Sequence, residues 1–480
     1  MTVTLSTTAD IDLEVVRRVA WHHERIELSP DARARIQARR RDFEAFVAAN
    51  ADRHLYGITT RHHRGARTVL PMEERAEYHR RVPPTPPSVG SPMPARLVRG
   101  IIVARLASFL DGHAGVRTDT VVTVAAMLDR PLPYVPERGH GEPGDIIALG
   151  HLFRGLDSEV DFGVGGAMPL VNGSPCAAAA LADVVLAGRQ RARLAEEAFA
   201  LAAEAILAPL EHYDAVFERL WGDEHQAAAL RRIRELLDGG HTPRRRYQAP
   251  VSFRNAPRML GWLGRLQAQG EECAALSLRA VTGNPAFVFP EDHPPYGAVL
   301  SNGSYYNPVA APLMNGFART WADVAQLATH QGQRLIEDPD GPLANEAESR
   351  TSLLYMTQTG WAEEARLAAQ PTLISLGGVS PTDTSTPDLL AWRLAHEAGR
   401  ALEVSLATLA TVAVHTIEQA GRRPPKRLEP LFEQVLECLP VGADPGAYGP
   451  GLSRLADAFA RRVLETSQDV SEEGAAVSGG

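Results

Sequence analysis

The clearest pattern along the chain is an apolar stripe near its C-terminal end. Between Thr386 and Ala420, leucine, alanine and isoleucine recur every three or four positions, as on a helix with one buried face. Thr386 suits an N-cap, Pro387 suits the first helical position, and Gly421 suits the position just past the helix end. A helix of about 30 residues is a rod of roughly 45 Å. We therefore predict one unusually long helix in this segment.

Helical spacing of apolar residues recurs elsewhere in the chain. It is present in residues 1–50, in residues 94–113, and in residues 177–222, where Gly188 is a possible interruption. Several long rods of this kind favour a helical bundle that shares its core between subunits. The pattern predicts a mainly α fold.

Three turn-rich stretches interrupt the N-terminal part. Residues 54–70, HLYGITTRHHRGARTVL, are rich in Gly, Thr and His, and residues 82–94, VPPTPPSVGSPMP, cannot form a helix interior. Residues 137–151, ERGHGEPGDIIALGH, combine a glycine-containing loop with an apolar run that resembles a helix start. Free backbone N–H groups at a helix start suit polar chemistry.

We predict three regions along the chain. An N-terminal domain at residues 1–195 carries the loops, a long-helix bundle occupies residues 196–465, and residues 466–480 form a disordered tail.

Composition disfavours several functional classes. The chain has 480 residues and a net charge of −9, so it offers no general basic field for nucleic acid. Its three cysteines lack metal-ligand spacing, which indicates a reducing compartment. The only lysine, Lys426, lies in the proline-broken segment RRPPKRLEP. A lysine Schiff base with pyridoxal phosphate is therefore disfavoured, and a GxxxxGK[ST] phosphate loop is excluded.

The sequence predicts a cytoplasmic protein. The N-terminus MTVTLSTTADIDLEVVRR has no apolar signal region, and we find no run of about 18 apolar residues that would span a bilayer. We expect no membrane association, no nucleic-acid partner, no metal and no cofactor.

Six motifs, in order, resemble segments of the histidine and aromatic amino-acid ammonia-lyase family. They are YGITT, GHGEPGDIIALGH, LVNGSP, QAPVSFRNAPRMLG, VTGNP and SNGSYYNP. The corresponding family segments are YGxNTGFG, GSxGASGDLAPLAH, LxNGT, QDxYSLRCxPQxxG, xTDNP and GGNFHG. The resemblance covers roughly residues 50–310. It implies a fumarase/aspartase-type long-helix bundle, with an N-terminal domain that bears the active site. It also implies a homotetramer with active sites shared between subunits.

In that family, an Ala-Ser-Gly triplet cyclises and loses water to form the electrophile methylidene-imidazolone. The matching residues here are Glu142, Pro143 and Gly144. Proline has no hydroxyl to eliminate, and its nitrogen already belongs to a ring. The resemblance therefore identifies a member that cannot make the family's prosthetic group at this loop.

The resemblance also implies roles for several residues. Tyr56 matches the family's general base, Arg254 matches the arginine that binds the substrate carboxylate, and Asn172 matches an asparagine beside the electrophile. The alternatives are a buried tyrosine with a satisfied hydroxyl and, for Asn172, an Asn-Gly turn.

Other positions depart from the family pattern. Val251 replaces a tyrosine, and Tyr305 and Tyr306 stand in the segment that carries histidine and phenylalanine. Arg61, His62 and His63 stand where the Tyr loop of the family has its second glycine-containing stretch, GFG. Residues 381–383, Pro-Thr-Asp, lack the glutamate of the family's acidic pair. We include Tyr305, Tyr306, His62 and His63 among the candidate substrate-binding residues.

Glu142 would stand where the electrophile was, as a candidate acid or base or as a simple helix cap. The two histidines could shuttle protons or be solvated on a loop. No HxxxH or HExxH spacing supports a metal site.

We predict an acid/base enzyme without methylidene-imidazolone, with Tyr56 and Glu142 as catalytic residues. Its substrate would be a small carboxylate or carbonyl metabolite, transformed by elimination, isomerisation or cyclisation, in specialised metabolism. The alternatives are a non-catalytic relative that binds a metabolite or partner, and a true ammonia-lyase or aminomutase.

Overall fold

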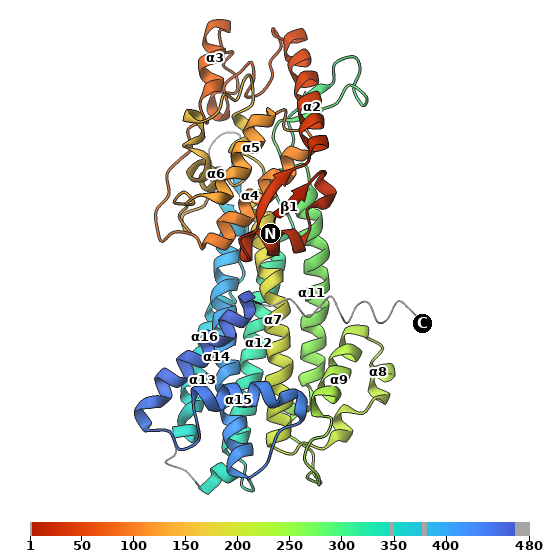
Figure 1. Ribbon diagram of the computed structural model, residues 1–480, viewed down its shortest axis with the longest axis vertical. Helices are drawn as coiled ribbons and strands as arrows, with labels where there is room; N and C mark the ends of the chain where they lie inside the picture. Colours follow the sequence, from red (N-terminus) through yellow and green to blue (C-terminus); the bar gives the residue numbers. More distant parts are fainter. Residues whose placement is uncertain (1, 346–349, 377–381, 466–480) are drawn as a thin grey trace. The chain divides into compact units, whose positions relative to one another are not determined.

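The computed structural model describes residues 2–345, 350–376 and 382–465, which form a mainly helical structure (Figure 1). The predicted tail at 466–480 and Pro381 lie outside the described residues. The chain divides into two compact units. Unit 1 lies within Met1–Leu186, Gly270–Met314 and Pro371–Arg393, and unit 2 within Ala187–Gln269, Asn315–Gln370 and Leu394–Gly480. This division differs from a single boundary near residue 195, because two later segments pack with the N-terminal residues.

Unit 1 combines helices of up to 20 residues with short strands. Its elements are β1 Thr2–Leu5, α1 Leu13–Val16, β2 Arg25–Leu28, α2 Pro30–Ala49, α3 Met72–Arg80, α4 Ala95–Leu110, α5 Thr118–Ala126, α6 Ile146–Phe153, β3 Ala286–Val288, β4 Ala298–Leu300, β5 Ser375–Leu376 and β6 Thr384–Ser385. The strands pair as β1–β2 in parallel, and as β3–β4 and β5–β6 antiparallel.

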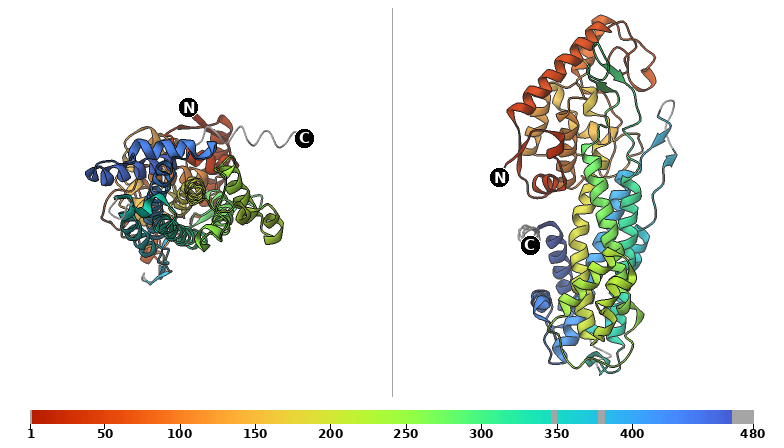
Figure 2. Two further views of the ribbon diagram at one scale, coloured as in Figure 1. Left: turned by 90° about the horizontal axis from the view of Figure 1, so that it is seen from below. Right: turned by 90° about the vertical axis from the view of Figure 1, so that its right-hand side faces the viewer.

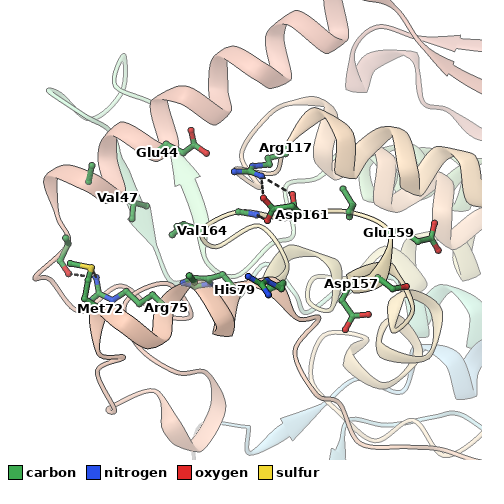
Figure 3. A pocket seen from close by; sticks show the side chains of 17 residues that line it. Glu44, Val47, Met72, Arg75, His79, Arg117, Asp157, Glu159, Asp161 and Val164 are labelled. Carbon is green, nitrogen blue, oxygen red and sulfur yellow. Dashed lines mark hydrogen bonds and ion pairs between the residues drawn. The ribbon is translucent and has the colours of Figure 1, made fainter.

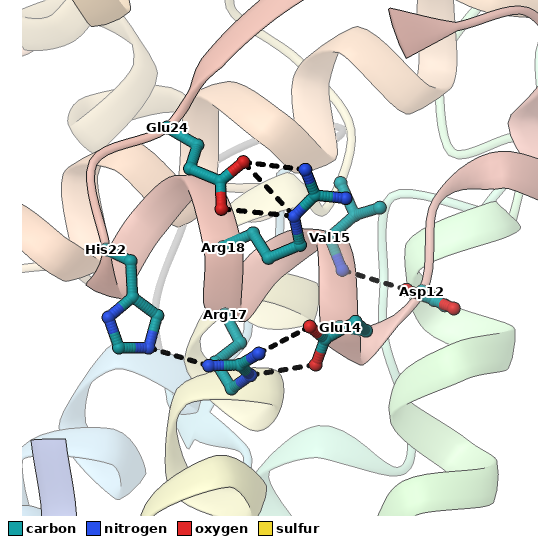
Figure 4. Close-up of polar contacts among 7 residues, drawn as sticks. All are labelled: Asp12, Glu14, Val15, Arg17, Arg18, His22 and Glu24. Carbon is teal, nitrogen blue, oxygen red and sulfur yellow. Dashed lines mark hydrogen bonds and ion pairs between the residues drawn. The ribbon is translucent and has the colours of Figure 1, made fainter. Parts of the chain in front are cut away.

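The first 28 residues differ from the helical prediction. Strands β1 and β2 flank the short helix α1 and a π-helical turn, Arg17–Trp21. Figure 4 shows the polar contacts here: Asp12 caps α1 by accepting from the Val15 amide at 2.8 Å, and Arg18 is 2.6 Å from Glu24. Alternating burial along each strand shows that these apolar residues follow a period of two.

A buried carboxylate joins several elements of unit 1. Asp183 accepts hydrogen bonds from the indole nitrogens of Trp21 at 3.1 Å and Trp392 at 2.9 Å, and from Arg96 Nε at 2.8 Å. These donors come from the π-helical turn, from the start of α14 and from α4. Only 4% of Asp183 is exposed, so these bonds replace its hydration.

Four long helices contribute residues to both units: α7 Pro175–Ala205, α11 Ala256–Arg279, α12 Ala310–Ile336 and α14 Asp388–Gln419. Their unit-2 segments run side by side in Figure 1 and in the right-hand view of Figure 2. The other helices of unit 2 are α8 Val216–Trp221, α9 Glu224–Leu237, α10 Val251–Arg254, α13 Arg350–Ala368, α15 Glu429–Cys438 and α16 Tyr448–Glu465. A buried ion pair of 2.8 Å between Arg191 and Glu403 links α7 to α14.

The long C-terminal helix confirms the prediction from the apolar stripe. Helix α14 begins two residues after Thr386 and ends just before Ala420. Gly421 has a φ of +66°, and the Arg422 amide donates to the Ile417 carbonyl at 3.0 Å, as in a glycine-terminated helix end.

Helix α7 differs from its prediction at Gly188 and at its C-terminal end. It continues through Gly188, where a Cβ would lie 2.5 Å from the Gln267 side chain on α11, so glycine permits close helix packing. The helix ends at Ala205, well before residue 222, because Leu207 is left-handed (φ +56°) and Pro209 cannot continue the hydrogen bonding.

Within the part of the chain that the structure describes, two segments are long and apolar enough to span a membrane by composition, contrary to the prediction that no such run exists: Met168–Ala205 and Asp388–Gln419. In each, 94% of the most apolar window is buried inside the protein. Both therefore have the burial expected of core helices in a helical bundle.

Candidate functional site

A cavity of about 370 Å³ in unit 1 gathers most of the predicted site residues. The side chains or backbone of Tyr56, His62, His63, Pro143, Gly144, Asn172 and Tyr305 line it, together with Ala66, Pro83, Pro84, Thr85, Ile146, Met168, Val171, Asn284, Ser301, Asn302 and Thr382. Apolar walls with a few polar groups are typical of small-molecule sites. We refer to it as the tyrosine cavity.

The Tyr56 loop is held from both sides by the core. Leu55 and Ile58, on either side of Tyr56, are buried in a cluster with Phe43, Phe46 and Phe287. The rings of Phe43 and Phe287 meet edge to face at 5.4 Å. Tyr56 therefore projects from an anchored loop.

The backbone after this loop turns toward the Tyr56 hydroxyl. His63 adopts a left-handed conformation, with a φ of +52°, and its amide donates to the Tyr56 hydroxyl oxygen at 3.3 Å. A residue with a Cβ pays about 1–2 kcal/mol for this conformation, whereas glycine adopts it freely. The His63 ring lies 3.2 Å from the Thr382 hydroxyl, measured from Nε2.

His62 lines the cavity next to His63. Its Nδ1 is hydrogen-bonded to the hydroxyl of Tyr78, on helix α3. Burial lowers the pKa of His62, and the neighbouring His63 and Arg61 lower it further. His62 is therefore a neutral imidazole at pH 7.

The loop before α6 brings Pro143 and Gly144 to the cavity wall. Gly144 has a φ of +71°, and a Cβ there would lie 2.9 Å from the Cβ of Tyr305. Glycine is thus required both for the backbone conformation and for the close approach of Tyr305.

Glu142 points to the helix start and is not among the residues that line the tyrosine cavity. Its Oε1 accepts a hydrogen bond from the Ile147 amide at 2.9 Å, and Thr386 N lies 3.4 Å from its carbonyl oxygen. His140 Nδ1 lies 3.5 Å from the same carboxylate oxygen. Burial lowers the pKa of His140, but Glu142, the Pro136 carbonyl and Asp145 together outweigh burial, so the net shift is upward. These contacts favour the helix-cap interpretation of Glu142 over the catalytic one.

Asn172 is held by the segment that follows α11. Its amide nitrogen donates to the Asn284 carbonyl at 2.7 Å, and its oxygen accepts from the Asn284 amide at 3.3 Å. The Asn284 side chain in turn binds Ser301 at 3.0 Å and the Asn302 amide at 3.1 Å. The motifs LVNGSP, VTGNP and SNGSYYNP thus meet in one hydrogen-bonded wall of the cavity.

Two carboxyl groups, those of Asp145 and Asp388, are buried near the loop that precedes α6. The Asp145 carboxylate accepts from the amides of Cys176 at 2.7 Å and Ala177 at 3.3 Å. Burial, reinforced by Asp388 and Glu142, nevertheless raises the pKa of Asp145 to about 8. Burial also raises the pKa of Asp388 to about 7, although the Ala311 amide donates to it at 3.1 Å.

We expect Asp145 to make the folded state less stable as the pH rises from its ordinary pKa of 3.8 to about 8. Over this range the unfolded carboxyl is ionised while the folded one keeps its proton, so the folded state binds more protons and alkali favours unfolding. Asp145→Asn should therefore lose less melting temperature than the wild type between pH 5 and pH 8. Scanning calorimetry measures this, with the exposed Asp238→Asn as control; an equal loss in Asp145→Asn and wild type would refute the assignment.

The remaining predicted residues lie elsewhere. Tyr306 follows Tyr305 but is not among the residues that line the cavity. Arg254 belongs to unit 2, at the end of α10, where its Nε donates to the Ala249 carbonyl at 2.9 Å. Its role as a carboxylate ligand stays a prediction.

Several residues in and around the site were not predicted from the sequence. Tyr78 lies in a charged helix, MEERAEYHR, and nothing in that pattern connects it to His62. Asn284 and Asn302 stood in recognised motifs, so their asparagine side chains were the available signal.

A larger cavity of about 1000 Å³ lies between α2, α3 and the loop at residues 157–164 (Figure 3). Most of its charged side chains are engaged in local contacts. Arg117 is 2.5 Å from Asp161, Arg75 donates to the Leu70 and Ala51 carbonyls, and the His79 ring lies 2.9 Å from the Ile58 carbonyl oxygen. This cavity presents apolar surface and mostly paired charges.

Comparison with known proteins identifies the family. A sequence profile described as "Aromatic amino acid lyase" matches residues 11–167 and 158–438, which together cover most of the chain. The chain belongs to this family. Among its relatives, the histidine ammonia-lyase of Deinococcus radiodurans is 24% identical over 93% of this chain and 91% of its own length. The histidine ammonia-lyase of Symbiobacterium thermophilum is 27% identical over 77% of this chain and 75% of its own length.

Solved structures share the fold of this family member. The ergothionase of Treponema denticola has a TM-score of 0.82 at 17% identity, covering 97% of this chain and all of its own. The histidine ammonia-lyase of Trypanosoma cruzi has a TM-score of 0.82 at 20% identity, covering 97% and 94%. The tyrosine aminomutase of Streptomyces globisporus has a TM-score of 0.81 at 19% identity, covering 97% and 98%. These likenesses confirm the predicted mainly α, ammonia-lyase-like fold.

Proposed function

We propose that this family member is an acid/base enzyme that works without methylidene-imidazolone. Its substrate would be a small carboxylate or carbonyl metabolite, and its reaction an elimination, isomerisation or cyclisation, in specialised metabolism. The observation that carries the proposal is that Pro143 lines the same cavity as Tyr56, His62 and His63.

The residues present do not fit the family's prosthetic group. Formation of that group needs a serine hydroxyl that leaves and a backbone nitrogen that is free to enter the new ring. Pro143 supplies neither, because it has no hydroxyl and its nitrogen is already bonded to its own side chain.

The cavity keeps groups that hold and move protons. The Tyr56 hydroxyl is the proposed base, because Tyr56 matches the general base of the family. The imidazoles of His62 and His63 are further groups that can bind or transfer a proton. Asn172 and Tyr305 would orient the substrate. Arg254 keeps its proposed role as carboxylate ligand on the resemblance alone.

We expect the purified protein to show its full sequence mass and to lack the near-ultraviolet absorbance of methylidene-imidazolone. Intact-mass spectrometry, followed by peptide mapping across residues 142–144, measures this. A deficit of two water molecules in that tripeptide would overturn the proposal and favour a true ammonia-lyase or aminomutase, the activity named for several of the relatives.

Catalysis can be tested before the natural substrate is known. An enzyme that removes a proton from carbon in a reversible step exchanges that proton with solvent. The protein is incubated in D₂O with a panel of amino acids and aryl-substituted carboxylates, and deuterium incorporation is followed by mass spectrometry. Incorporation above the protein-free rate supports the enzyme. Tight binding of a panel member without exchange or product would favour the alternative, a non-catalytic metabolite-binding relative.

We also propose a cytoplasmic homotetramer with shared active sites. Large apolar side chains are exposed on α11 and α13, where Trp262 is 51% exposed, Leu276 65% and Met356 57%. Contiguous exposed apolar surface marks interfaces in soluble proteins, so these side chains are the proposed contacts between subunits. Light scattering of the purified protein should give four times the chain mass of 51.9 kDa. A monomer at micromolar concentration would contradict the shared-site arrangement.

A further inference from the structure

We propose that Tyr78 is a positioning residue that fixes the tautomer of His62, so that His62 presents an Nε2–H donor for a substrate oxygen. The inference rests on the proposed function for the presence of a substrate in the tyrosine cavity. It adds a hydrogen-bond donor and a supporting tyrosine that the family resemblance does not supply, because His62 stands where the family segment YGxNTGFG has phenylalanine.

The geometry separates the two ring nitrogens. His62 lines the cavity, whereas its bonding partner Tyr78 is not among the lining residues. Nδ1 is occupied by the Tyr78 hydroxyl. Nε2 is therefore the ring nitrogen left for a ligand.

The chemistry of the pair sets the direction of the hydrogen bond. A phenol is a better donor than acceptor, and an unprotonated imidazole nitrogen is a strong acceptor. Burial raises the pKa of Tyr78, so the phenol keeps its proton at neutral pH. Tyr78 therefore donates to Nδ1. A neutral imidazole with an accepting Nδ1 carries its hydrogen on Nε2.

The surroundings keep the ring neutral. Burial lowers the pKa of His62, and the charges of His63 and Arg61 act in the same direction. The ring is then a fixed donor whose charge does not change near pH 7. A donor of this type matches an acceptor oxygen, such as that of a carboxylate or carbonyl, and stabilises negative charge that develops there.

The tautomer can be read directly, without substrate. Magic-angle-spinning NMR of protein labelled with ¹⁵N-histidine distinguishes protonated from unprotonated ring nitrogens, and the His62 signals are assigned by their loss in His62→Gln. At pH 7.5 we expect an unprotonated Nδ1 and a protonated Nε2. The opposite tautomer, or an imidazolium with both nitrogens protonated, would overturn the proposal.

Replacement of Tyr78 tests whether it sets the tautomer. In Tyr78→Phe the aromatic ring remains but the donor is gone, so the His62 signals should shift toward a mixture of tautomers. The matched control is Tyr134→Phe, since Tyr134 also contacts a histidine ring, that of His151 at 5.9 Å, and its hydroxyl binds the Gly90 carbonyl. Unchanged His62 signals in Tyr78→Phe would overturn the role of Tyr78.

Two substitutions at His62 separate a donor from a base. Glutamine can place an amide N–H near the position of Nε2 but cannot accept a proton, whereas phenylalanine fills the space with no donor. In the D₂O exchange assay, His62→Gln should stay within about tenfold of the wild type, and His62→Phe should fall roughly 10- to 100-fold. Equal losses in the two variants would overturn the donor role. Absence of exchange in the wild type would count against the proposed function alone, because the NMR result stands independently.

Discussion

Replacing Tyr56 by phenylalanine is expected to lower the rate of substrate deuterium exchange by about 10²–10⁴-fold, the range typical for loss of a general acid or base. The Tyr56 hydroxyl oxygen accepts a hydrogen bond from the His63 amide. This backbone donor holds the hydroxyl oxygen in one place. Removal of this oxygen leaves the ring and the apolar contacts of the loop. The expected loss is therefore in turnover, with little change in KM or in melting temperature.

The control for this variant is Tyr134→Phe, which removes an exposed phenol outside the tyrosine cavity. It should exchange deuterium at the wild-type rate. If Tyr56→Phe also exchanges within a few-fold of wild type, Tyr56 is not the proton-transfer group, and the imidazole of His63 becomes the first candidate.

The long helices were predictable because their signals are local. The stripe at Thr386–Ala420, the proline at its start and the glycine at its end act within one element, and α14 forms over nearly the same residues. Gly188 was harder, because only the neighbouring helix shows that the missing side chain makes room for Gln267. A helix interruption and a close helix contact have the same sequence signature.

The first strands show the limit of pattern analysis in short segments. In Thr2–Leu5 and Arg25–Leu28, four residues each are too few to separate a period of two from a period of 3.6. Their parallel pairing depends on residues more than twenty positions apart, which no local pattern records.

The candidate site was predictable where its residues stand in motifs that the sequence shows directly. Tyr56, His62, His63, Asn172 and Tyr305 all line the tyrosine cavity. Glu142 could not be placed from sequence, because a carboxylate at a helix start can turn either to the amides of that helix or to a cavity. The structure shows the first orientation, with the Ile147 amide as donor. Tyr78 could not be found either, since its link to His62 is a contact between a helix and a loop.

Removing the carboxylate of Asp183 is expected to destabilise the protein by about 3–5 kcal/mol, because a buried acceptor that three donors share is lost. Asp183→Ala deprives Trp21, Trp392 and Arg96 of a shared acceptor. Trp21 and Trp392 donate from their indole nitrogens. Because Trp392 is buried, water cannot readily replace the carboxylate as its acceptor. The measurement is the urea midpoint at fixed protein concentration.

An exposed ion pair provides the matched comparison for Asp183. Asp161 also pairs with an arginine, Arg117 at 2.5 Å, but 73% of its side chain is exposed. Asp161→Ala should therefore cost only about 0–1 kcal/mol, because water solvates the remaining guanidinium. The contrast between the two variants tests burial rather than pairing as the source of the effect. Equal shifts of the urea midpoint would show that the hydrogen bonds of Asp183 contribute no more to stability than a surface ion pair. The stability of this region would then have to come from the packing of Trp21 and Trp392.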